Sequence, residues 1–73
     1  RTLELPVPTE RGKHIVVKQI TNDTAVLIES GRMDEVGANL VLGHIEGGPN
    51  TLLKLEHGKT VSLIADGATW RML

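Results

Sequence analysis

Hydrophobic and polar positions alternate with a period of two along most of the chain, and glycine or proline interrupts the alternation every few residues. This period is typical of β-strands, whose successive side chains point to opposite faces of a sheet. One window with helical spacing, residues 30–42, contains Gly31 and Gly37, which disfavour a helix. The pattern therefore predicts an all-β fold, a small antiparallel meander of about six or seven short strands with a sandwich or barrel-like shape. The expected strands are residues 2–5, 14–20, 24–29, 39–46, 51–55, 59–65 and 68–73.

Two neighbouring segments are apolar on both of their faces. Segment 14–20 contains the apolar run 15–17, and segment 24–29 contains the apolar run 25–28. Residues 21–23, Thr-Asn-Asp, predict a turn between them, so the two segments should form a hairpin. Strands that are apolar on both faces need to be covered on both sides, and a chain of 73 residues has few other segments to provide this cover.

The remaining segments predict connections rather than strands. Residues 32–37 are mostly polar and do not alternate, so we expect an irregular connection there. The run Gly-Gly-Pro-Asn at 47–50 predicts a loop, and His57-Gly58 predicts a turn.

Asp66-Gly67, between two alternating runs, predicts a hairpin with a two-residue type I′ turn and a positive φ at Gly67. In that register Ala65 faces Ala68, Leu63 faces Trp70 and Val61 faces Met72. Trp70 should then be buried, either in the core or against a neighbouring subunit, while Arg71 should be at least partly exposed.

Composition limits the classes of function. The chain has 73 residues, which makes one β domain over 1–73 at most, and it has no cysteine for disulfides or thiolate metal sites. One aromatic residue and a net charge of −1 argue against nucleic-acid binding. No apolar run approaches the ~20 residues that a membrane span needs, so no membrane insertion is expected. The start at Arg1 suggests a fragment of a longer polypeptide, with Leu73 at a C-terminal end.

No group of residues has the spacing of a catalytic or metal site. The histidines are separated by thirty and thirteen residues, the serines lack a nucleophile motif, and the acidic residues fit a solvated connection. We therefore expect no catalytic residues, no metal and no cofactor. The residues considered are His14, His44, His57, Ser30, Ser62, Glu29, Asp34 and Glu35.

Trp70 is the one candidate receptor-binding residue, and it has two interpretations. An exposed tryptophan would suggest sugar stacking or a protein contact. A tryptophan on an alternating strand beside Met72, in a chain with no other aromatic, favours a core or subunit-interface anchor.

The C-terminal stretch KTVSLIADGATWRML, residues 59–73, resembles the closing hairpin of β-modules in bacteriophage tail-fibre and tail-spike proteins. In those modules an apolar strand runs into Asp-Gly, two small or polar residues and a tryptophan. The segments LELP at 3–6 and GKHIVVKQ at 12–19 are similar to their opening strands. The chain departs from the family pattern at Gln19 and Thr69, where asparagine is usual.

The resemblance implies a homotrimeric structural or attachment module of a virion appendage, with no catalysis of its own. Its partners would be its own copies, other appendage segments, and a host-surface glycan or protein; its location would be the virion, after synthesis in the host cytoplasm. Two alternatives remain open: a non-catalytic accessory domain of a polysaccharide-degrading tail spike, and a capsid decoration or assembly module. Composition agrees with the trimer, because a short chain without disulfides is stabilised by burying apolar surface against copies of itself.

Overall fold

The structure is a computed structural model that describes residues 2–46 and 48–73. In this part of the chain there are eight short strands and no helix, and hence no helix that could cross a membrane. The strands are β1 (Thr2–Glu4), β2 (His14–Gln19), β3 (Ala25–Glu29), β4 (Arg32–Val36), β5 (Leu40–Ile45), β6 (Gly48–Lys54), β7 (Thr60–Ala65) and β8 (Trp70–Met72).

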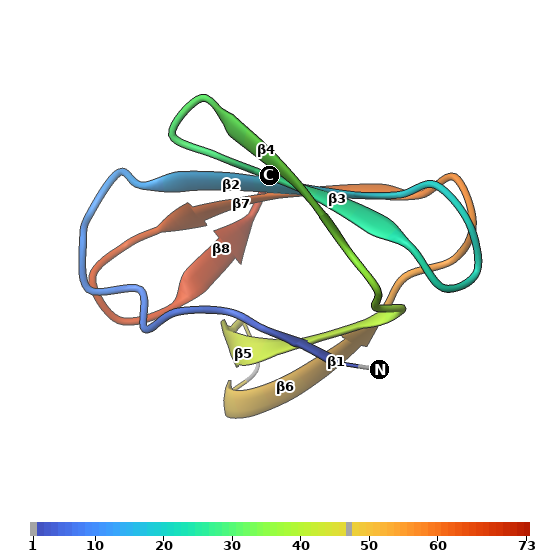
Figure 1. Ribbon diagram of the computed structural model, residues 1–73. Helices are drawn as coiled ribbons and strands as arrows, with labels where there is room; N and C mark the ends of the chain where they lie inside the picture. Colours follow the sequence, from blue (N-terminus) through green and yellow to red (C-terminus); the bar gives the residue numbers. More distant parts are fainter. Residues whose placement is uncertain (1, 47) are drawn as a thin grey trace.

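The strands form one sheet that curls into an open, barrel-like shape with two layers (Figure 1). In the upper layer β4, β3, β2, β7 and β8 follow one another and pair antiparallel. In the lower layer β5 pairs antiparallel with β6 and parallel with β1, and a parallel contact between Ile45 and Trp70 joins β5 to β8. The predicted all-β, barrel-like fold is confirmed, with two parallel strand pairs added to an otherwise antiparallel sheet.

The core lies between the two layers and follows the predicted alternation. Every second residue of β2, β5 and β7 is buried, because its side chain points into the space between the layers. Leu5, just after β1, packs so closely on Gly43 that a Cβ at that position would lie 2.9 Å from the Leu5 Cβ. The buried core residues are Leu5, Ile15, Val17, Ala25, Val41, Ile45, Leu55, Val61, Leu63, Ala65 and Trp70.

Gln19, the last residue of β2, is a fully buried polar side chain within this core. Its Nε2 donates hydrogen bonds to the backbone oxygens of Thr21 and Ala38, each 2.8 Å away. Thr21 belongs to the predicted turn after β2, and Ala38 belongs to the link between β4 and β5. Gln19 thus holds two connections of the chain against the end of one strand.

The prediction of an irregular connection over residues 32–37 is wrong, because residues 32–36 form the strand β4. β4 forms a hairpin with β3 through Ser30 and Gly31, whose φ angles of 51° and 78° are both positive, as a type I′ turn requires. Four of its five residues are exposed, so neither face selects apolar side chains and the strand leaves no alternation in the sequence.

The loop predicted over residues 47–50 is also wrong in its larger part. β6 begins at Gly48, which pairs with Ile45, and the ladder between β5 and β6 shifts register between Gly43 and Ile45. Gly47 lies outside the described residues. Backbone pairing with β5, rather than a side-chain pattern, makes this segment a strand.

The hairpin of β7 and β8 forms as predicted, but its turn and register differ. Trp70 lies opposite Ala65, Arg71 opposite Ile64 and Met72 opposite Leu63, so four residues, 66–69, form the loop. Gly67 has the predicted positive φ of 100°, whereas Asp66 does not have the positive φ of a type I′ turn. The shift of two residues keeps each side chain on its predicted face.

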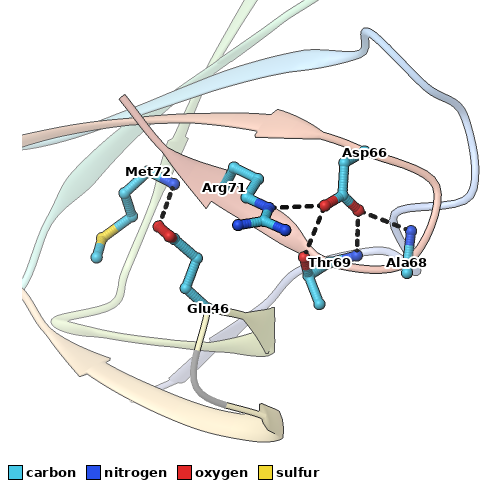
Figure 2. Close-up of polar contacts among 6 residues, drawn as sticks. All are labelled: Glu46, Asp66, Ala68, Thr69, Arg71 and Met72. Atoms are coloured by element: carbon cyan, nitrogen blue, oxygen red, sulfur yellow. Dashed lines mark hydrogen bonds and ion pairs between the residues drawn. The ribbon is translucent and has the colours of Figure 1, made fainter.

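The side chain of Asp66 explains the longer loop. Its Oδ1 accepts hydrogen bonds from the backbone N–H groups of Ala68 and Thr69, at 2.9 and 2.7 Å (Figure 2). Its Oδ2 accepts from the Thr69 hydroxyl at 3.1 Å and from Nε of Arg71 at 2.7 Å. These four bonds satisfy polar groups of residues 68, 69 and 71 around a four-residue loop. In a two-residue turn, residues 68 and 69 would belong to the strand instead.

Candidate functional site

The structure places Trp70 in the core, with none of its surface exposed. Its Nε1 donates a hydrogen bond to the backbone oxygen of Pro6 at 2.9 Å, which ties β8 to the segment after β1. The predicted burial of Trp70 and exposure of Arg71 are confirmed. Because the indole ring offers no exposed face, it cannot stack on a sugar in this conformation.

The other residues considered for chemistry are spread over the molecule. His14 begins β2, His44 lies on β5 and His57 lies in the turn before β7. Within residues 2–46 and 48–73, no three side chains of His, Cys, Asp or Glu come together as metal ligands would. Asp34 and Glu35 are successive residues of an exposed strand and so point to opposite faces.

The outer face of the upper layer is the candidate functional surface. Figure 1 shows no strand of the lower layer above β2, β3 and β7, and β4, which pairs with β3, rises above them in this view. We define the outer apolar patch as the hydrophobic residues on this face. They are Val16, Val26, Ile28, Met33, Ile64 and Leu73.

The centre of the outer apolar patch is a row that crosses the sheet. Met33 lies opposite Ile28, and Ile28 lies opposite Val16. Val16 lies opposite Ser62, whose backbone oxygen accepts a hydrogen bond from the N–H of Leu73 at 3.0 Å. Four steps between neighbouring strands make this row roughly 19 Å long. Its ends are exposed, Met33 by 70% and Leu73 by 76%, while its middle residues are partly buried by their neighbours.

Polar residues surround the outer apolar patch. The register places Glu35 and Lys18 on either side of Val26, two strands apart and both exposed. At the opposite rim His14 lies beside Ile64, which lies beside Arg71. An apolar centre with a polar rim is the usual anatomy of a protein–protein contact surface.

The charges on this face are separated along the sheet. Glu35 lies on β4, whereas Lys18 lies on β2 and Arg71 on β8. The ion pairs seen among the described residues are Lys13–Glu29 at 2.8 Å and Arg71–Asp66 at 2.7 Å, so Glu35 and Lys18 are not neutralised within the chain. Arg71 is neutralised by Asp66, so the unpaired charges that the face carries are acidic on β4, at Glu35, and basic on β2, at Lys18.

The open edge strands of the sheet, β1, β4 and β6, are less suited to association than this face, and β1 is only three residues long. β4 is five residues long and exposes Arg32, Asp34 and Glu35, and β6 exposes Lys54 and contains Pro49, which has no N–H to donate. Short edge strands with charged residues or proline resist pairing with another strand. The uncovered face, rather than an edge, is the candidate contact surface.

A shallow open hollow of about 530 Å³ adjoins the patch at Ile28. Its walls are residues 10–14, on one side, and the turn at Ser30 and Gly31, on the other. Lys13 is held there by its ion pair with Glu29, and the hydrogen bond of this pair raises the pKa of Lys13. With Glu10, Arg11 and Lys13 in its lining, the hollow carries charges of both signs.

No match was found when the chain was compared with protein-family models, curated proteins and solved structures.

The sequence predicts only part of the outer apolar patch. The apolar runs 15–17 and 25–28 indicate that β2 and β3 have a second apolar face. Met33 lies in a segment that predicts an irregular connection, so its place beside Ile28 depends on the β3–β4 pairing. Ser30-Gly31 could have indicated this pairing from the sequence. The dipeptide lies between segments 24–29 and 32–36, and glycine in a two-residue turn is typical of hairpins.

Proposed function

We propose that this chain is a structural assembly module of a bacteriophage virion appendage, a tail fibre or tail spike, in which three copies associate. The observation that carries the proposal is the outer apolar patch, which this chain leaves uncovered on one layer of a two-layer fold. Covering such a patch with a second copy removes apolar surface from water and so stabilises the assembly. The resemblance of residues 59–73 to the closing hairpin of appendage modules supports the virion setting.

In this function the polar groups of the domain have structural roles. Nε1 of Trp70, the carboxylate of Asp66 and Nε2 of Gln19 each make hydrogen bonds within the fold, and these bonds hold the C-terminal hairpin and the connections in place. The domain builds or caps the appendage, and its loops are the part left to face a host-surface receptor.

The mass of the protein in solution tests this proposal. Sedimentation equilibrium over a range of concentrations should give three times the chain mass, in equilibrium with the monomer. Val16→Lys places a charge at the centre of the outer apolar patch and should shift the protein to the monomer. Leu52→Lys is the matched control, because Leu52 is an exposed leucine, at 55%, on β6 of the other layer.

A mass equal to the monomer at every concentration would contradict the proposal. Loss of the trimer in Leu52→Lys together with its retention in Val16→Lys would show that another surface makes the contact.

A further inference from the structure

The outer face consists of two unlike parts. The part on β3 and β4 carries Ile28, Met33 and the acidic Glu35. The part on β2 and β7 carries Ile64 and the basic Lys18, with Val16 at the boundary. Both parts have apolar side chains at their centre, and their charges are opposite in sign.

Glu35 and Lys18 do not neutralise each other within this chain. They lie on strands that are separated by β3, at positions that flank Val26, and so their backbones are roughly 10 Å apart. Neither takes part in an ion pair among the described residues, and both are exposed. Each of them is therefore available to pair with an opposite charge on another molecule.

A second copy of this chain supplies such a partner. In a closed ring of identical subunits every contact joins one surface part of a subunit to a different part of its neighbour. The acidic β3–β4 part and the basic β2–β7 part are two such different surfaces on one face. Their apolar centres would be buried together, with the opposite charges at the rim.

We propose that neighbouring copies pack head to tail across this face, with Glu35 of one subunit opposite Lys18 of the next. This inference rests on the proposed function, because it names the contact that forms the trimer. The rim charges would then set the order of the subunits around the ring, while the apolar patch supplies most of the affinity.

Charge reversal with rescue tests the pairing. Lys18→Glu and Glu35→Lys, made separately, should each weaken self-association about tenfold or more, because like charges then face each other. The double variant, Lys18→Glu with Glu35→Lys, should restore association to near the wild-type level. Lys54→Glu is the control, since Lys54 is an exposed lysine on β6 of the other layer, and its association should be unchanged. Both reversed residues are exposed, so unfolding of the dilute monomer should differ little between variants.

The outcomes separate the two proposals. A wild-type protein that is monomeric at all concentrations would overturn the proposed assembly and this inference with it. A wild-type trimer in which the single reversals have no effect, or in which the double variant fails to recover, would overturn the pairing of Glu35 with Lys18 and leave the assembly standing.

Discussion

At the scale of single residues, Asp66 determines how the chain turns between β7 and β8. Its carboxylate accepts four hydrogen bonds, from two backbone N–H groups, a hydroxyl and a guanidinium (Figure 2). The bond from Arg71, followed by those from the Thr69 and Ala68 backbone, holds the pKa of Asp66 well below its ordinary value of 3.8. All four bonds depend on an acceptor that the ionised form provides best.

The pH dependence of stability tests the role of Asp66. A carboxyl group whose pKa is lower in the folded state stabilises the fold fully above its unfolded pKa, here 3.8, and loses this effect as the pH falls towards the folded pKa. Asp66→Asn should therefore be less stable than wild type at neutral pH, and the difference should shrink below about pH 4. Urea unfolding at several pH values measures it.

Asp23→Asn is the reference for this experiment, because the Asp23 carboxylate accepts no hydrogen bond in the described part of the chain. A difference between wild type and Asp66→Asn that stays constant down to about pH 2 would contradict the role assigned to ionised Asp66.

Trp70 is the second residue whose contacts decide its role. Trp70→Ala should cost about 3–5 kcal/mol of unfolding free energy, because it removes a fully buried aromatic side chain from a small core. Trp70→Phe should cost less, since it keeps most of the apolar contact and loses the hydrogen bond to Pro6. Denaturant unfolding of both variants measures the costs. An unchanged midpoint in Trp70→Ala, with loss of adhesion to cells or glycans, would instead make Trp70 a receptor contact.

At the scale of elements, the β3–β4 hairpin creates the acidic part of the outer face. Its strands meet at Ser30-Gly31, where Glu29 and Arg32 form the closing pair. A positive φ at both turn residues suits glycine and asparagine and disfavours β-branched side chains. The stability of β4 therefore depends on the turn more than on burial of its side chains.

The two residues of this turn should respond differently to substitution. Gly31→Val should cost more than ~1 kcal/mol, and the cost would come from backbone strain, because no atom beyond the two adjacent residues lies within 4 Å of a Cβ at Gly31. Ser30→Asn should be neutral or slightly stabilising, because asparagine tolerates positive φ better. Thermal unfolding of the two variants compares them. Equal destabilisation by both would argue against a type I′ turn at this position.

At the scale of the whole molecule, the balance between core and surface favours association. The core is formed by one set of alternating residues between two layers, while the second apolar face of β2 and β3 remains partly exposed. A small fold without disulfides has a small free energy of unfolding. Burial of that face against a second copy would therefore add a large fraction to this free energy.

Thermal unfolding at different protein concentrations tests this balance. If only the folded chain associates, the unfolding midpoint should rise with concentration, because association removes folded monomer from the equilibrium. The rise should disappear in Val16→Lys and persist in Leu52→Lys. A midpoint that does not depend on concentration in the wild type would contradict association of the folded chain.

The sequence by itself determined the all-β class, the β2–β3 hairpin and the burial of Trp70. The class and the burial of Trp70 follow from local alternation, in which apolar residues at every second position point away from water. The hairpin follows from the turn residues 21–23 between two apolar segments. The same alternation placed the residues of β7 and β8 on their correct faces, since an error of two residues in register leaves the faces unchanged.

Only the tertiary structure decided the register of that hairpin, the existence of β4 and the start of β6. The register depends on hydrogen bonds from the Asp66 side chain, and β4 and β6 depend on backbone pairing with β3 and β5. Neither effect leaves a pattern of apolar residues along the chain. The outer apolar patch combines both origins: Val16 and Ile28 belong to the apolar runs of β2 and β3, whereas Met33 joins them only because the backbone of β4 pairs with β3.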